Sequence, residues 1–286
     1  MLKKKLAMTT LAAAAALLMG GAQAAPTTIT NGTLTARIND AGTFSSSADS
    51  ISPSSPGTPG LSYGGIEYVN YGTPLSWYWF QNSASDSVAS LGSNPLSALT
   101  VGAGSSATVT MSFGSLTFLQ MIGITGPNSL GVSVSITNNG ADMSGVRWGV
   151  GLDPDQGIPL AGTYSTTNTI LAQGAAAAVI ASYGGHSVTL RNTTSASATS
   201  IAAYIDGTCC APVNPINALG AGQLPGYSTV ADHSISLAYD LGTLAHGQTA
   251  VIGYEYVFAV PEPESYAMFL AGLAMIGVMV RRRTSV

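Results

Sequence analysis

The chain has 286 residues, of which only 8% are charged, and a formal net charge of −4 at pH 7. All three lysines and three of the six arginines lie at the two ends, so residues 25–259 carry 11 acidic and three basic side chains. A nucleic-acid-binding domain needs a positively charged surface, so this composition excludes nucleic acid as a partner. It also disfavours electrostatic attraction to anionic lipid.

The first 24 residues have the pattern of a secretory signal peptide. A basic start (Lys3, Lys4 and Lys5) precedes an apolar stretch over residues 6–19, and Ala22 and Ala24 supply the small side chains that a signal peptidase reads. Cleavage is expected after Ala24, with the next residue as the alternative. The apolar stretch is shorter than the roughly 20 residues that span a bilayer, which favours a removable signal over a retained helix.

Residues 25–259 predict a single β-rich body. Apolar and small or polar residues alternate over residues 130–137, 235–242 and 250–258, as in half-buried strands. Further strands are expected at residues 33–39, 66–71, 107–113, 116–124, 146–152, 176–183, 187–192 and 201–205. Turn sequences separate them, the segment 45–60 is expected to be a surface loop, and no capped helix of period 3.6 is expected in the body. The predicted class is therefore all-β, an antiparallel β-sandwich.

The most concentrated polar cluster is the segment 153–157. Asp153 and Asp155 lie two residues apart before a glycine and offer the oxygen ligands that Ca²⁺ prefers, although the spacing matches a calcium loop incompletely. The alternative is a tight turn in which Asp153 accepts backbone N–H bonds. The two carboxylates are also the residue type of a glycoside hydrolase pair, but alternate residues rarely face one cleft from opposite sides.

The aromatic segment 77–80 offers a second candidate site. In an alternating strand, Trp77 and Trp79 share one face, which would give a stacking platform for sugar rings. The alternative is a strand that is buried on both faces.

Two cysteines, Cys209 and Cys210, are adjacent, and export would place them in an oxidising compartment. They could close a vicinal disulfide, stay as free thiols or bridge to another chain. Asp232, His233 and Ser234 have the residue types of a hydrolase triad, but consecutive strand residues point to alternate faces and cannot form that relay. We expect no catalytic residue and no cofactor.

The C-terminal segment 260–286 has three parts. Pro261, Glu262 and Pro263 form an extended stretch, residues 265–280 carry no charge, and Arg281, Arg282 and Arg283 follow. An apolar helix followed by a positive cluster stops translocation. At 1.5 Å per residue the helix would be about 24 Å long, which is short for a hydrocarbon core of about 30 Å.

This arrangement resembles the PEP-CTERM sorting domain. The resemblance implies processing by an exosortase, a membrane-embedded transpeptidase of Gram-negative bacteria, with Pro261, Glu262 and Pro263 as recognition residues. It implies passage through the inner membrane, temporary anchoring there, and delivery to the cell surface or an exopolysaccharide matrix. The expected organisation is therefore a signal peptide (1–24), a sandwich body (25–259) and a sorting tail (260–286).

Two short stretches of the body resemble known β-domains. Residues 31–35 with 40–44 resemble the first hairpin of galactose-mutarotase-like supersandwiches, and residues 240–248 resemble a turn common in bacterial surface domains. The sequence thus leaves two functions open. One is a non-enzymatic structural or adhesive protein of a biofilm matrix, and the other is a secreted carbohydrate-binding module or glycan-active enzyme.

Overall fold

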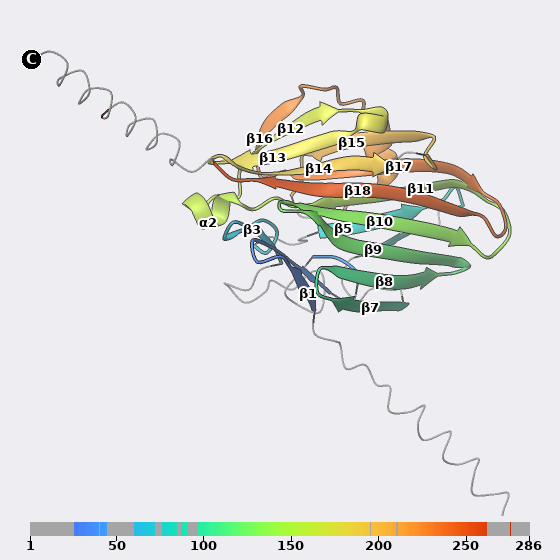
Figure 1. Cartoon of the computed structure of the whole chain (residues 1–286). Helices are drawn as coiled ribbons and strands as arrows, with labels where there is room; N and C mark the ends of the chain where they lie inside the picture. Colours follow the sequence, from blue (N-terminus) through green and yellow to red (C-terminus); the bar gives the residue numbers. More distant parts are fainter. Residues whose placement is uncertain are drawn as a thin grey trace, which may run out of the picture.

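The computed structural model describes residues 26–39, 41–44, 60–71, 76–84, 87–90, 97–194, 196–209, 211–261 and residue 275. Within them the chain forms two large antiparallel sheets packed face to face and a smaller sheet at one end (Figure 1). This confirms the predicted all-β antiparallel sandwich.

The larger layer is a nine-stranded sheet, which faces the viewer in Figure 1. From one edge to the other its strands are β16 (Ser228–Ala231), β12 (Thr166–Ala172), β13 (Ala178–Tyr183), β14 (His186–Thr194), β18 (Thr249–Ala259), β10 (Ser129–Asn138), β9 (Leu116–Gly126), β8 (Ser106–Phe113) and β7 (Ser97–Ala103). The longest strands, β9, β10 and β18, lie side by side near the middle. In β9 and β10, the alternation of buried and less buried residues is the pattern on which the sequence prediction relied.

The second layer has five strands and lies behind the first in Figure 1. Its order is β15 (Ser200–Asp206), β17 (Ser234–Leu244), β11 (Met143–Leu152), β5 (Ser76–Gln81) and β6 (Ser87–Ala89). The chain therefore crosses repeatedly between layers, and β17 and β18, which follow each other in sequence, belong to different sheets.

The smallest sheet is built from the first part of the body and lies beside β7 (Figure 1). Its strands are β1 (Thr27–Thr30), β2 (Leu34–Ile38), β3 (Leu61–Tyr63) and β4 (Ile66–Glu67). The turn between β1 and β2 forms because the Asn31 side chain accepts the backbone N–H groups of Thr33 and Leu34 at 3.0 and 2.8 Å.

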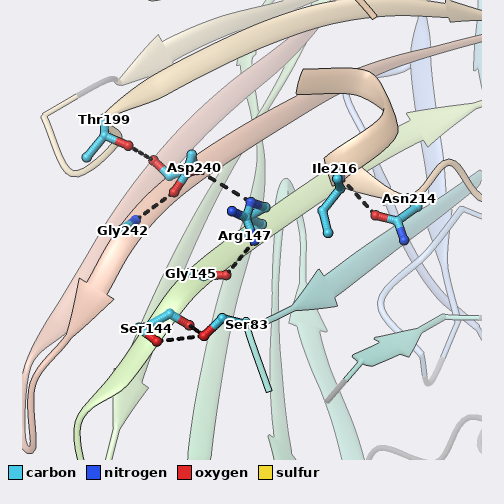
Figure 2. Close-up of polar contacts among 9 residues, drawn as sticks. All are labelled: Ser83, Ser144, Gly145, Arg147, Thr199, Asn214, Ile216, Asp240 and Gly242. Carbon is cyan, nitrogen blue, oxygen red and sulfur yellow. Dashed lines mark hydrogen bonds and ion pairs between the residues drawn. The ribbon is translucent and has the colours of Figure 1, made fainter. Parts of the chain in front are cut away.

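Three short helical segments connect the strands: α2 (Gly157–Ala161), η1 (Gly174–Ala176) and α3 (Pro215–Gly220). The expectation of no capped helix is wrong for α3, because Asn214 caps it and its side chain accepts the N–H of Ile216 at 2.9 Å (Figure 2). Pro215 occupies the first turn, where its missing N–H costs nothing. Six residues are too few to show a helical period, so the sequence pattern does not reveal this helix.

The core fills the space between the two large sheets. Tyr78 of β5 and Trp148 of β11 stack with ring centroids 4.9 Å apart and planes inclined by 10°. Phe118 of β9 reaches them from the opposite sheet, 5.6 Å from Trp148. Aromatic rings of both layers thus interlock, which fixes how the two sheets sit on each other.

Both terminal segments of the predicted organisation fall almost entirely outside the described residues. In the part of the chain that the structure describes, no helix is long and apolar enough to cross a membrane. The expected loop at residues 45–60 also lies outside it, except for Gly60.

Candidate functional site: a groove on the open sheet face

A groove of about 490 Å³ lies on the face of the nine-stranded sheet that points away from the core. One row of paired residues crosses it: Ser106 of β8 pairs with Gly123 of β9, Gly123 with Gly131 of β10, and Gly131 with Glu255 of β18. The neighbouring row brings Thr108, Met121, Ser133 and Gly253 into line. Three glycines lie in these rows. Gly123 leaves its outward position open, whereas threonine side chains occupy the space above the other two: Thr125 above Gly131, and Thr193 and Thr194 above Gly253.

The side chains around this floor are mostly hydroxyls. They are Ser106, Thr108, Thr125, Ser133, Thr193 and Thr194. Met121 is the large apolar side chain of the open face here, and it is 49% exposed. Hydroxyls that donate and accept hydrogen bonds, next to a thioether that offers apolar contact, suit a ligand with many hydroxyl groups and apolar C–H faces.

The negative charge of Glu255 in the groove is neutralised by an ion pair with Arg191. The Glu255 carboxylate accepts Thr125 Oγ1 at 2.6 Å, and Arg191 donates to its other oxygen from Nε at 3.0 Å and from Nη2 at 2.6 Å. Burial raises the pKa of Glu255, but hydrogen bonds from Thr125, Arg191 and Ser129 outweigh burial and leave this pKa below its usual value. Glu255 is thus held as an ion-paired carboxylate, and a neutral ligand meets no uncompensated charge.

The predicted stacking platform is not open in this structure. Trp77 is 1% exposed and packs with Val213, Ala218 and Ala238 beneath α3. Its ring lies so close to Gly151 that a Cβ there would come within 2.6 Å of Trp77 Cζ2. The burial of Trp77 removes it from the stacking platform and fits the alternative of a strand that is buried on both faces. Trp79 is half-buried.

The two aspartates of the segment 153–157 interact with different neighbours. Burial, followed by the charge of Asp232, raises the pKa of Asp153 to about 7. The charge of Asp155 instead contributes to the raised pKa of Tyr71. The Asp155 N–H donates to the Tyr68 carbonyl at 2.7 Å. The group of metal-ligating residue types around Asp153 contains Asp232 and Cys209, and a calcium site shared by Asp153 and Asp155 stays a prediction. Asp153 thus lies near Asp232. Burial raises the pKa of Asp232 as well.

Cys209 takes part in a disulfide, and Cys210 is the only other cysteine in the chain. Because Cys210 lies outside the described residues, the vicinal ring stays a prediction. Asp232 and His233 lie in the turn between β16 and β17, and Ser234 begins β17. His233 Nδ1 meets Thr229 Oγ1 at 3.1 Å, and Ser234 donates to the Thr208 carbonyl at 3.3 Å, so the two side chains have separate partners.

Most residues of the expected sorting machinery lie outside the described part of the chain. These are Ala22, Ala24, Glu262, Pro263, Arg281, Arg282 and Arg283. Pro261 is described, and it lies at the surface directly after β18.

Sequence reasoning missed the groove and the proximity of Asp153 to Asp232. The signal for the groove was present as Gly123, Gly131 and Gly253, each at an outward position of an alternating strand. Their meeting in one place depends on which strands are neighbours, and alternation alone does not give that order.

Comparison with known families identifies the C-terminal segment. Residues 259–283 match the PEP-CTERM protein-sorting motif, which confirms the resemblance drawn from the Pro-Glu-Pro stretch. This chain is thus an antiparallel β-sandwich that carries an exosortase sorting motif. The motif marks it as a protein exported from the cytoplasm of a Gram-negative bacterium.

Three solved structures are similar to the body. A protein assigned as an aldose 1-epimerase from Escherichia coli K12 aligns over 82% of this chain and 99% of its own length, with 12% identity and a TM-score of 0.47. A protein assigned as a kojibiose phosphorylase from the human microbiome aligns over 74% of this chain but 26% of its own (12% identity, TM-score 0.37). Heparinase III aligns over 65% and 24%, respectively (8% identity, TM-score 0.37). Comparison with curated proteins gave no match.

Proposed function

We propose that the mature body is a non-enzymatic adhesive protein of the cell surface or extracellular matrix, and that it binds a neutral exopolysaccharide in the open-face groove. The observation that carries the proposal is the glycine-floored, hydroxyl-lined groove itself. Its volume of about 490 Å³ falls within the range of about 300–1,000 Å³ that is usual for ligand sites.

Three features support a neutral glycan as the ligand. The groove offers hydroxyls for hydrogen bonds to sugar hydroxyls, its carboxylate is paired with Arg191, and Met121 offers apolar contact. The body carries a net charge of −8, so an anionic polysaccharide would be repelled at long range. The sorting motif then delivers this surface to the place where such polymers accumulate, after a temporary stay in the inner membrane.

The acid–base groups of the groove support binding rather than glycoside hydrolysis. Glycoside hydrolysis requires a pair of carboxyl groups on opposite sides of the scissile bond. Among the described residues that line the groove, Glu255 is the one carboxylate, and Arg191 holds it ionised. A glycan-active enzyme is the alternative function, and released sugar in the assay below would favour it.

The test uses a side chain that fills the groove without strain. A Cβ at Gly123 would meet nothing closer than 3.8 Å, so the Cβ of Gly123→Tyr fits at this position, from which its ring is expected to fill the groove. Val251→Tyr is the matched control, because Val251 is 37% exposed on the same sheet face and lies outside the groove lining.

Binding is measured on an array of neutral and anionic glycans with the purified exported protein. We expect binding to neutral polymers, loss of at least about tenfold in affinity for Gly123→Tyr, which is about 1.4 kcal/mol, and no change for Val251→Tyr. Equal binding by both variants would contradict the groove as the site.

A further inference from the structure

Three neighbouring strands of the five-stranded sheet have ends that lie side by side, and these ends bring two carboxylates together. β11 ends opposite the start of β17, with Leu152 paired to Ile235, and β15 ends there too, with Asp206 paired to Ser234. Asp153 follows β11 directly, and Asp232 precedes β17. A carboxylate oxygen of each, together with the Cys209 sulfur, lies within 4.8 Å of the others.

The Asp153 side chain is enclosed but unsatisfied. Asp153 is 1% exposed, and in the described part of the chain its Oδ1 has no hydrogen-bond partner. Asp232 Oδ1 is likewise enclosed and without a partner among those residues. Leaving a buried polar atom unpaired is costly, and more so for a charged one. Two neighbouring carboxylates that each hold such an oxygen therefore point to a shared ligand.

The protein's own cations are used elsewhere. No lysine occurs after Lys5, so the body has only three arginines. Arg37 donates to Thr28 Oγ1 at 3.2 Å, Arg147 lies 3.4 Å from Asp240 (Figure 2), and Arg191 binds Glu255. His233, beside Asp232 in sequence, can carry positive charge, and its Nδ1 meets Thr229 Oγ1 at 3.1 Å.

The spacing fits one hard cation. Ca²⁺ binds oxygens at about 2.3–2.6 Å, so two oxygens on one ion lie at most about 5.2 Å apart. The 4.8 Å limit on the Asp153 and Asp232 oxygens is within that span. Cys209 is in a disulfide, and metals bind the thiolate form of cysteine, so its sulfur is a neighbour rather than a ligand.

We propose that Asp153 and Asp232 bind one Ca²⁺ ion where β11, β15 and β17 meet. Ca²⁺ takes six to eight oxygens, so water and backbone carbonyls fill the remaining positions. The ion joins the end of β11 to the β16–β17 turn and thereby ties an edge strand of the nine-stranded sheet to the second layer. With two carboxylates the site belongs to the weak extracellular class, with a Kd of about 10⁻⁴–10⁻³ M.

The test is calorimetric titration of CaCl₂ into the full-length exported protein after EDTA treatment and dialysis. We expect one ion per chain and a higher melting temperature with saturating Ca²⁺. Asp153→Asn and Asp232→Asn are each expected to weaken binding by about tenfold or more, because ligand charge sets the affinity of such sites. If Asp153→Asn fails to fold, Asp232→Asn provides the test, because Asp232 is only half-buried.

Asp206→Asn is the matched control. Asp206 lies at the same sheet edge and its Oδ1 accepts the Thr208 N–H at 3.1 Å, so the variant removes the same charge outside the proposed pair. We expect Ca²⁺ binding by this variant to be unchanged. Absence of binding by the wild type, or an equal loss in Asp206→Asn, would overturn the site. So would binding of Zn²⁺ only after reduction, because the Cys209 thiolate would then be the ligand. These outcomes are independent of glycan binding in the groove.

Discussion

The ring of Pro261 lies against Gly185, so closely that a Cβ on Gly185 would come within 2.7 Å of Pro261 Cγ. The preceding residue, Val260, lies against Gly64 in the same manner, at 2.9 Å. Just upstream, the Phe258 N–H donates to the Asn128 carbonyl at 2.9 Å. The sorting motif thus begins on the surface of the body, against two hairpin turns, without a spacer after β18.

Replacing Gly185 with alanine is expected to loosen this junction. Gly185 has φ +82°, and a left-handed conformation costs a residue with a Cβ about 1–2 kcal/mol. The new Cβ would in addition collide with Pro261. We expect a larger loss in the free energy of unfolding than strain alone produces, measured by urea denaturation.

Gly65→Ala is the control for strain alone. Gly65 has φ +83°, and a Cβ added to it would meet no other atom within 4 Å, so it shares the conformation of Gly185 without the neighbour. Equal losses in the two variants would show that the contact between Pro261 and Gly185 contributes nothing.

Trp77 is expected to be a stability residue. Truncating a buried tryptophan to alanine costs about 3–5 kcal/mol, because the cavity and the lost burial add. Trp77→Ala should therefore lower the free energy of unfolding by several kcal/mol, and Trp79→Ala by less, because Trp79 is only half-buried. A folded, stable Trp77→Ala protein that has lost glycan binding would instead restore the stacking hypothesis.

Glu67 is expected to make the protein less stable as pH rises. Burial raises the pKa of Glu67 to about 7, against the lowering effect of the N–H groups of Leu61, Val69 and Gly60 that donate to its carboxylate. Between pH 4.5 and 7 the folded state then keeps a proton that the unfolded state has released, so stability falls across this window. The fall is on the order of 3 kcal/mol.

Urea unfolding of wild type and Glu67→Gln at about pH 4.5, 6 and 7.5 measures this effect. Asp153 contributes a fall of the same sign, so the diagnostic quantity is the difference between the two proteins. The variant should show the shallower dependence on pH. Parallel curves would contradict the assignment to Glu67.

The ion pair of Glu255 and Arg191 is expected to make the protein more stable as pH rises, the opposite of the effect of Glu67. Because the pKa of Glu255 is lowered on folding, its contribution is present above the unfolded pKa near 4.5 and is lost as pH falls. The Arg191 side chain is 52% exposed, which limits the stabilisation to about 1 kcal/mol. Arg191→Gln should be less stable than wild type at about pH 7, and the difference should shrink as the pH falls below the unfolded pKa, by urea denaturation. A difference that persists in acid would exclude the ion pair as its cause.

The sequence was sufficient for the sandwich and the sorting motif, because both are written in local patterns. Alternation over residues 130–137 predicts β10 with its correct inward face, and Gly184 and Gly185 predict the hairpin between β13 and β14. Prediction fails where a feature depends on strand order. Asp153 and Asp232 are distant in sequence and meet only because β11 and β17 are neighbours.

The same limit applies to two other candidate sites. Asp153 and Asp155 are close in sequence, yet they act on different neighbours, because the chain turns between them. Trp77 alternates with Tyr78 as predicted, but the face it occupies is covered by α3, a helix too short to be recognised from its pattern.

We propose that the open-face groove holds this protein in a neutral polysaccharide matrix. The most direct measurement is the fraction of protein retained in the extracellular matrix of the producing bacterium, compared between wild type, Gly123→Tyr and Val251→Tyr at equal export. We predict that wild type and Val251→Tyr stay in the matrix and that Gly123→Tyr is released into the medium. Retention of Gly123→Tyr at the level of wild type would contradict the account.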